Sequence, residues 1–224
     1  MATLTLVRHG QASFGSADYD QLSPLGQQQC VWLGEYFKDS GKHFDHVVRG
    51  TLKRHQQSAD CIMGSFPEVK AVDTDPRLNE FAFVEVVKAY LKKHPSLTPQ
   101  ADTPPREYYR ILKKAMYAWQ QDELDGALLS ESWLDFKTRT HAALHDLLNS
   151  EYKNILVVSS GGAISLVLQS VLHAPDKTAI ALNLQMKNAS VSECFFGKGQ
   201  ASLSLFNSTS YMETAARREA ITYS

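Results

Sequence analysis

Cysteine is scarce in this chain, and the placement of the few that occur excludes the usual cysteine-based sites. Cys30, Cys61 and Cys194 lie far apart in the sequence and form no Cys-x-x-Cys pair. An odd number of cysteines at such spacing indicates neither a disulfide framework nor a cysteine metal centre. We therefore expect three reduced thiols, as in a cytoplasmic protein.

Excess charge and long apolar segments are also missing. The 23 Lys and Arg residues nearly balance the 24 Asp and Glu residues, and the basic pairs are scattered, so no overall positive field attracts nucleic acid. No apolar run approaches membrane-spanning length, and the first three residues lead directly into an apolar segment without the charged start of a signal peptide. We expect a soluble cytoplasmic protein whose partner is a small anionic ligand, not nucleic acid or a membrane.

The most informative stretch is residues 4–10, an apolar run that ends abruptly in Arg8, His9 and Gly10. It predicts a buried strand with reactive groups at its carboxyl end, where ligands collect in open α/β sheets. His9 is then placed as a nucleophile or base, with Arg8 as an anion clamp. The stretch by itself is equally compatible with a strand end that carries two solvated polar residues.

The strand, polar turn and helix pattern recurs along the chain, which at 224 residues is long enough for one large domain or a core domain with an insertion. Ser23 and Pro24 predict the start of a helix that stops near Gly41. The other expected elements are strands over 46–49, 69–72 and 155–158, a helix after residue 52, helices over 133–148 and 163–172, and an edge hairpin formed by 190–196 and 201–206.

The strand pattern vanishes between residues 80 and 128, where aromatic and aliphatic residues recur at helical intervals between prolines. We interpret this stretch as a helical insertion, or cap, beside the sheet. Its cluster of Tyr108, Tyr109, Tyr117 and Trp119 fits helix packing better than a substrate cage, although aromatics in a cap could select an apolar leaving group. His141 and His145 have a metal-ligand spacing but no evident third ligand, so we interpret both as surface histidines.

Five motifs occur in a definite order: Arg8-His9-Gly10, residues 22–26 (LSPLG), residues 52–59 (LKRHQQSA), residues 78–80 (LNE) and residues 157–162 (VVSSGG). Together they resemble the histidine phosphatase superfamily, also called phosphoglycerate-mutase-like, and the match spans most of the chain. The resemblance implies a single domain over residues 1–224, built as a three-layer α/β/α sandwich with a mainly parallel sheet and the cap at 80–128.

The resemblance also implies a metal-independent phosphatase that transfers a phosphoryl group in two steps through a phosphohistidine. His9 would attack phosphorus, Arg8 and Arg54 would hold the phosphoryl oxygens, and Glu80 would protonate the leaving oxygen. Each residue type suits its role, since neutral imidazole is a competent nucleophile, guanidinium groups match phosphate oxygens, and a carboxyl group can act as general acid. No cofactor is expected.

The polar loop after Gly10, which begins at Gln11 and ends near residue 20, is placed where it could cover the bound substrate, and we count Gln11 as a substrate-binding residue. Gly161 would offer a backbone N–H to a phosphate at the start of a helix. The mutase branch of the family is disfavoured because this loop lacks the Glu-Ser and Trp-Asn residues of that branch. A homodimer is left open.

One departure from the family pattern concerns Ser160, which stands where members usually carry a second histidine before the glycine pair. Loss of a charged donor to a transition state costs about 2.7 to 4 kcal/mol on the scale of an oxyanion-hole donor. Two alternatives therefore stay open, a slow phosphatase and a phosphate-binding module without catalysis. His55 could reach the phosphate in place of the missing histidine, but its position favours a partly exposed helix residue.

Overall fold

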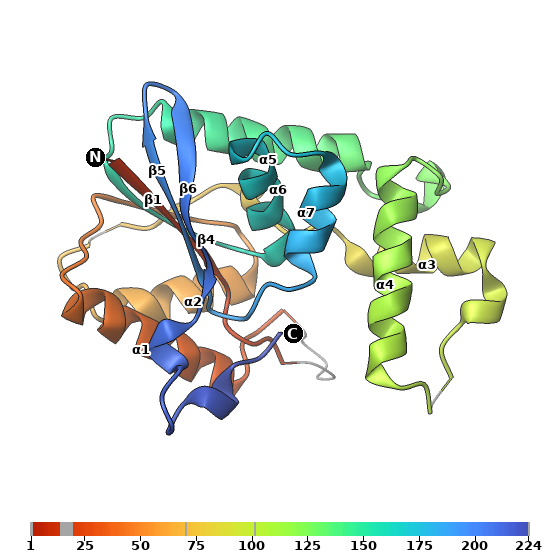
Figure 1. The fold of residues 1–224 in the computed structure, drawn as a ribbon, viewed down its shortest axis with the longest axis horizontal. Helices are drawn as coiled ribbons and strands as arrows, with labels where there is room; N and C mark the ends of the chain where they lie inside the picture. Colours follow the sequence, from red (N-terminus) through yellow and green to blue (C-terminus); the bar gives the residue numbers. More distant parts are fainter. Residues whose placement is uncertain (1, 14–19, 70, 101, 224) are drawn as a thin grey trace.

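The computed structural model describes residues 2–13, 20–69, 71–100 and 102–223. In these ranges six strands form one mixed sheet in the order β3-β2-β4-β1-β5-β6 (Figure 1). The strands β1, β4, β2 and β3 run parallel, and β5 and β6 form the antiparallel hairpin at one edge. The bounds of the strands are Ala2–Arg8 (β1), His46–Arg49 (β2), Asp73–Thr74 (β3), Asn154–Ser159 (β4), Val191–Gly197 (β5) and Gln200–Ser208 (β6).

Helices cover both faces of the sheet, and the central strand β4 shows why. Leu156 and Val158 belong to the same buried cluster as Leu33 of α1 (Pro24–Asp39) and Ile62 of α2 (Lys53–Met63). Their neighbours in β4 pack on the opposite face, against α5 (Trp133–Leu148) and α6 (Gly161–Val171). Because side chains alternate along a strand, a continuous apolar run serves both faces. The expected three-layer α/β/α sandwich is confirmed.

Local sequence signals account for where several helices begin and end. The Ser23 hydroxyl accepts a hydrogen bond of 3.0 Å from the Gly26 N–H, with Pro24 as the first helical residue of α1. Beyond the end of α1, Gly41 has φ +71°, a left-handed conformation that favours glycine. At α5, the side chains of Ser132 and Asp135 each bond to the other's backbone in a capping box.

The prediction of a strand at residues 69–72 was wrong. The third strand is Asp73–Thr74, which pairs in parallel with Val48 and Arg49 of β2. Val69 and Val72 instead pack, partly buried, against the apolar cluster that contains α1 and α2. The apolar run therefore reflects helix packing and not strand pairing. There are two smaller differences. Helix α6 begins at residue 161 and not at 163, and the short helix α7 (Asp176–Asn183) was not predicted.

The helical character expected between residues 80 and 128 is present as α3 (Phe83–Lys93) and α4 (Pro105–Gln120), with a 3-10 turn at Pro95–Leu97 between them and another at Gly126–Leu128 after α4. Both helices lie beyond α7, to one side of the sheet (Figure 1). Their apolar faces share one buried cluster with residues of α5, α6 and α7, including Trp119, Trp133 and Phe136. Trp119 is a packing residue as expected, but Tyr108 and Tyr109 are exposed, so the packing interpretation was wrong for these two.

None of the helices in the described ranges is long and apolar enough to cross a bilayer.

Candidate active site

The carboxyl ends of the parallel strands bring the chemistry-bearing residues to one edge of the sheet. His9 follows β1 directly, and its backbone N–H donates a hydrogen bond of 2.9 Å to the carbonyl oxygen of Ser159 at the end of β4. Ser160 comes next in the chain and is completely buried. The two strand ends that the sequence marked as reactive are therefore neighbours, as expected for a ligand site in an α/β sheet.

His9 is held in one orientation by the backbone. Only 5% of its surface is exposed, and Nδ1 lies 2.7 Å from the carbonyl oxygen of Gly10. Because a carbonyl oxygen can only accept, Nδ1 carries the proton and Nε2 has a free electron pair. Burial, followed by the charges of Arg54 and Arg8, lowers the pKa of His9 well below its ordinary value. The imidazole is therefore neutral at physiological pH.

Arg54 brings a positive charge to the same place from the first turn of α2. The side chain is 7% exposed, and Nη2 donates to the Ser160 hydroxyl at 3.5 Å. Nη1 forms an ion pair of 2.5 Å with the carboxylate of Asp20. The other carboxylate oxygen of Asp20 accepts from the Lys53 backbone N–H at the start of α2. Asp20 thus occupies one nitrogen of an arginine that is otherwise directed into the site.

Arg8 is fixed by the opposite end of the chain. Its Nη1 donates to the carbonyl oxygens of Met186 and Tyr223, the latter at 2.9 Å. Its Nε lies 3.6 Å from the position that a Cβ atom on Gly161 would occupy, so the guanidinium approaches the first turn of α6. The charges of Arg54 and Arg8 add to the effect of burial in lowering the pKa of His9, and they oppose the rise in the pKa of Glu80 that burial causes.

Glu80 is bound to the first turn of α6 through its carboxylate. Oε2 accepts from the Gly162 N–H at 3.0 Å, and Oε1 accepts from the Phe81 N–H at 3.2 Å. Burial raises the pKa of Glu80 above its ordinary value, although these two bonds and the nearby arginines oppose the shift. A Cβ on residue 162 would lie 2.1 Å from Oε1, so only glycine permits this approach. A carboxyl group with a raised pKa is suited to hold and release a proton.

The structure contradicts the expectation that His55 is partly exposed. The side chain is completely buried, and Nε2 lies 2.6 Å from the Ser160 hydroxyl oxygen. The ring centroids of His9 and His55 are 5.8 Å apart. Burial is the main cause that lowers the pKa of His55 well below its ordinary value. A second neutral imidazole therefore faces the same hydroxyl as Arg54.

Gln11 lies beside the site but is engaged elsewhere. Its Oε1 accepts from the Ser23 hydroxyl at 2.8 Å, and its backbone N–H donates to Gln29 Oε1 at 2.9 Å. Residues 14–19 of the expected covering loop lie outside the described residues. Gly161 lies beside Arg8, and a Cβ there would meet Asn183 Oδ1 of α7 at 2.4 Å. The substrate-binding roles of Gln11, Ser160 and Gly161 stay predictions.

The tail after residue 207 carried no sequence signal, yet it supports the site. Thr222 exchanges two hydrogen bonds with Asn188, one of 2.8 Å from the Asn188 N–H and one of 2.9 Å to its Oδ1. The buried Gln29 donates to Ala220 and Thr222 while its oxygen binds the Gln11 backbone. These contacts connect the tail to the segments around His9. No local pattern could have shown them, because the partners are more than thirty residues apart.

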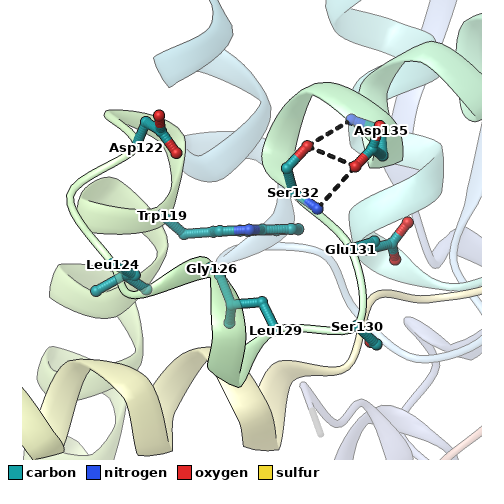
Figure 2. A pocket seen from close by; sticks show the side chains of 9 residues that line it. All are labelled: Trp119, Asp122, Leu124, Gly126, Leu129, Ser130, Glu131, Ser132 and Asp135. Atoms are coloured by element: carbon teal, nitrogen blue, oxygen red, sulfur yellow. Dashed lines mark hydrogen bonds between the residues drawn. The ribbon is translucent and has the colours of Figure 1, made fainter.

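A small cavity of about 230 Å³ lies between the end of α4, the segment that follows it and the start of α5, and none of the residues just described lines it (Figure 2). Trp119 crosses it, and the capping box of Ser132 and Asp135 forms one wall. His141 of α5 is half-buried, so the surface interpretation was wrong for it, while His145 is exposed. In the described part of the chain, no three His, Cys, Asp or Glu side chains gather in a metal-binding group.

Comparison with known proteins defines the class. A sequence profile of the histidine phosphatase superfamily (branch 1) matches residues 4–209, and the chain belongs to this family. The broad-specificity phosphatase YOR283W of Saccharomyces cerevisiae is 24% identical over 176 residues, which cover 74% of this chain and 68% of that protein.

Solved structures share the fold. The alpha-ribazole phosphatase from Shigella flexneri has a TM-score of 0.65 at 22% identity, covering 92% of this chain and 96% of that one. A phosphoserine phosphatase from Entamoeba histolytica, crystallised with phosphoserine, has a TM-score of 0.66 at 20% identity, covering 95% and 100% of the two chains. At such identities the likeness shows a shared fold and not a shared activity.

Proposed function

We propose that this protein hydrolyses phosphomonoesters through a phosphohistidine formed on Nε2 of His9, without a metal ion or cofactor. The observation that carries the proposal is the state of His9: its Nδ1 lies 2.7 Å from the carbonyl oxygen of Gly10, and its pKa is lowered by burial and by the charges of Arg54 and Arg8. A neutral nucleophile next to fixed positive charge is the arrangement that phosphoryl transfer requires.

In the first step Nε2 of His9 attacks phosphorus, and the bond from phosphorus to the ester oxygen breaks. Arg8 and Arg54 bind the phosphoryl oxygens and offset the charge that develops on them. The protonated carboxyl group of Glu80 gives its proton to the leaving oxygen. In the second step the Glu80 carboxylate takes a proton from water, the water oxygen attacks phosphorus, and the bond from phosphorus to nitrogen breaks. Inorganic phosphate and neutral His9 result.

The alternative is a phosphate-binding module without turnover, and Ser160 together with the Asp20 ion pair on Arg54 is the feature that favours it. Hydrolysis of p-nitrophenyl phosphate in excess chelator separates the two. A phosphatase releases nitrophenolate and a binding module leaves the ester intact. The substrate of the protein is the ester that shows the highest kcat/KM across a panel of phosphorylated metabolites and phosphopeptides.

His9→Ala tests the nucleophile. We expect a folded protein whose turnover falls by at least about a thousandfold, since the covalent route is removed. Quenching the wild type in alkaline detergent after reaction with labelled substrate should trap phosphate that is stable in alkali and labile in acid, and the variant should trap none. A folded His9→Ala protein that hydrolyses substrate at the wild-type rate would overturn the proposal.

We further propose that residues 1–224 act as one domain and that residues 80–128 form its cap. The cap shares its apolar cluster with α6 and α7, which supports folding as one unit. A cytoplasmic location is consistent with the three free cysteines. Size-exclusion chromatography with light scattering tests whether a homodimer forms.

A further inference from the structure

The Ser160 hydroxyl is the point where two basic side chains meet. His55 Nε2 is 2.6 Å and Arg54 Nη2 is 3.5 Å from Oγ, and Ser160 and His55 are both completely buried. Neither basic residue is near Ser160 in the sequence, since both come from α2. The contact is therefore built by the tertiary fold and not by a local turn.

Ser160 does not use its side chain in the way its position would suggest. It is the N-cap residue of α6, with extended backbone angles, yet its hydroxyl accepts no hydrogen bond from the first turn of the helix. The Gly162 N–H of that turn binds Glu80 instead. A serine at an N-cap normally satisfies such a group itself. The Ser160 hydroxyl instead bonds to His55 and Arg54, and it can also bond to a ligand in the site.

A count of protons defines what His55 can do. The guanidinium of Arg54 has no acceptor, so it donates to Ser160 Oγ. If His55 carries its proton on Nε2, it also donates to Oγ, and the Ser160 hydrogen is free for a third partner. If Nε2 is bare, the Ser160 hydrogen is used on His55. His55 Nδ1 is buried without a partner in the described structure. In folded proteins a buried N–H group without a hydrogen-bond partner is rarer than a buried acceptor without one. A proton on Nδ1 would leave an N–H group of His55 without a partner, so the proton is favoured on Nε2.

We propose that His55 is a positioning residue that acts through Ser160: Nε2–H holds the hydroxyl oxygen, and the Ser160 hydrogen then points at a phosphoryl oxygen bound beside His9. The proposal rests on the proposed function, because it assigns a third donor to the same phosphoryl group. The ring of His55 lies 5.8 Å from that of His9, so Ser160 is within the same small site. His55 and Ser160 thus form a two-residue donor.

The backbone around His55 is shaped to hold this ring. A Cβ on Gly50, at the end of β2, would lie 2.2 Å from His55 Nδ1 and 2.6 Å from Asn79 Oδ1. Burying an imidazole costs more than burying an apolar side chain of similar size unless its polar atoms are used. A purely structural role would therefore be met better by leucine, and the hydrogen bond to Ser160 is what distinguishes histidine here.

The test combines His55→Ala, His55→Gln, Ser160→Ala and the His55→Ala/Ser160→Ala double variant. Orthovanadate affinity and kcat/KM for p-nitrophenyl phosphate are measured together with Tm. Each alanine variant should bind vanadate about tenfold more weakly, which corresponds to 1.4 kcal/mol. The double variant should lose no more than one single variant, since both act through one hydroxyl. His55→Gln restores an N–H donor and should recover affinity to within about threefold of wild type.

His141→Ala is the control, because it removes a partly buried histidine of α5 that is not among the residues of the candidate site. It should lower Tm and leave vanadate affinity unchanged. Wild-type affinity in His55→Ala, or losses that multiply in the double variant, would overturn the proposal. If His55→Ala does not fold, His55→Leu, which fills the buried space without offering a donor, takes its place in the cycle. A wild-type protein that neither binds vanadate nor hydrolyses the ester would contradict the proposed function itself.

Discussion

Arg8 Nη1 donates a hydrogen bond of 2.9 Å to the backbone carbonyl oxygen of Tyr223, 215 positions further along the chain. One of the two arginines proposed to bind phosphate is therefore oriented by the C-terminal tail. The tail is in turn tied to Asn188 through Thr222. Because a guanidinium binds phosphate best in a fixed plane, the tail contributes to the site without touching its substrate.

Removal of residues 222–224 tests this contribution. The truncated protein should stay folded, bind orthovanadate about 3- to 30-fold more weakly and lose a similar factor in kcat/KM, because Arg8 loses an acceptor that orients it. Tyr223→Ala is the control, since it keeps the carbonyl oxygen and removes only a half-exposed ring. Equal losses in both proteins would show that the side chain, and not the backbone, matters.

Asp20→Asn tests the ion pair with Arg54. The amide can still accept from the Lys53 N–H but no longer neutralises the guanidinium, so an entering anion meets less competition. We expect orthovanadate and inorganic phosphate to inhibit the variant at about 3- to 10-fold lower concentration, with the difference shrinking at high salt. Weaker inhibition would mean that Asp20 orients Arg54 instead of competing for it.

Glu80→Gln should distinguish leaving groups. Nitrophenolate leaves readily without a proton, whereas an alkyl alkoxide does not, so the variant should lose about tenfold more kcat on an alkyl phosphate than on p-nitrophenyl phosphate. Orthovanadate affinity should change by less than about threefold. Identical losses on both esters would remove Glu80 from the role of general acid.

Gly162→Ala should move Glu80 without changing any ionisable group. The added Cβ would lie 2.1 Å from Glu80 Oε1 and 3.1 Å from a ring carbon of Phe81, so the carboxyl group has to shift. We expect its leaving-group pattern to resemble that of Glu80→Gln, with a loss of stability of about 1 to 3 kcal/mol from overpacking. Gly126→Ala, which meets nothing within 4 Å, is the control and should match wild type in rate.

The two buried histidines predict how stability varies with pH. Burial is the largest cause that lowers the pKa of His9 and of His55 below 6.5. Just below pH 6.5 these two histidines are therefore protonated in the unfolded chain but not in the folded protein. Above pH 6.5 the two histidines do not reduce the free energy of unfolding. As pH falls below 6.5, each reduces it by at most about 1.4 kcal/mol per pH unit. Glu80, with its raised pKa, acts in the opposite direction above pH 4.5.

Urea unfolding at pH 7.5 and 5.5 measures this effect. The wild type should lose more free energy of unfolding between the two pH values than His9→Gln/His55→Gln does. His145→Gln, at an exposed position, should behave like the wild type. A double variant with the wild-type pH dependence would show that other groups control acid stability.

Elements with a strong local signal could be predicted from the sequence. β1 is rich in apolar and β-branched residues, β4 contains a continuous apolar run, and α1 and α5 begin at capping serines, so each is specified by adjacent residues. The third strand was misplaced because the apolar residues Val69 and Val72 pack against the cluster that contains α1 and α2, and do not belong to a strand. The short helix α7, which positions Asn183 beside Gly161, has no comparable signal.

Within the candidate site, the strand end at His9 could be found from sequence because its residues are consecutive. The burial of His55 could not, since it depends on Ser160, 105 positions away. The same holds for the tail and Arg8. Hydrogen bonds across such separations follow from topology, and periodicity carries no information about them.

Glu80 is joined to the cap by its neighbour. Phe81 belongs to the apolar cluster of the cap, and its ring centroid lies 4.8 Å from that of Trp119 in α4. The residue proposed to give the proton is therefore anchored to the helices that we propose as a cap, while His9, Arg8 and Arg54 are anchored to the sheet and to α2. Substitutions that adapt these helices to a new ester would also change the surroundings, and therefore the acid strength, of Glu80. The preference for one leaving alcohol and the ability to protonate it would then change together, whereas phosphate binding by His9, Arg8 and Arg54 would stay constant.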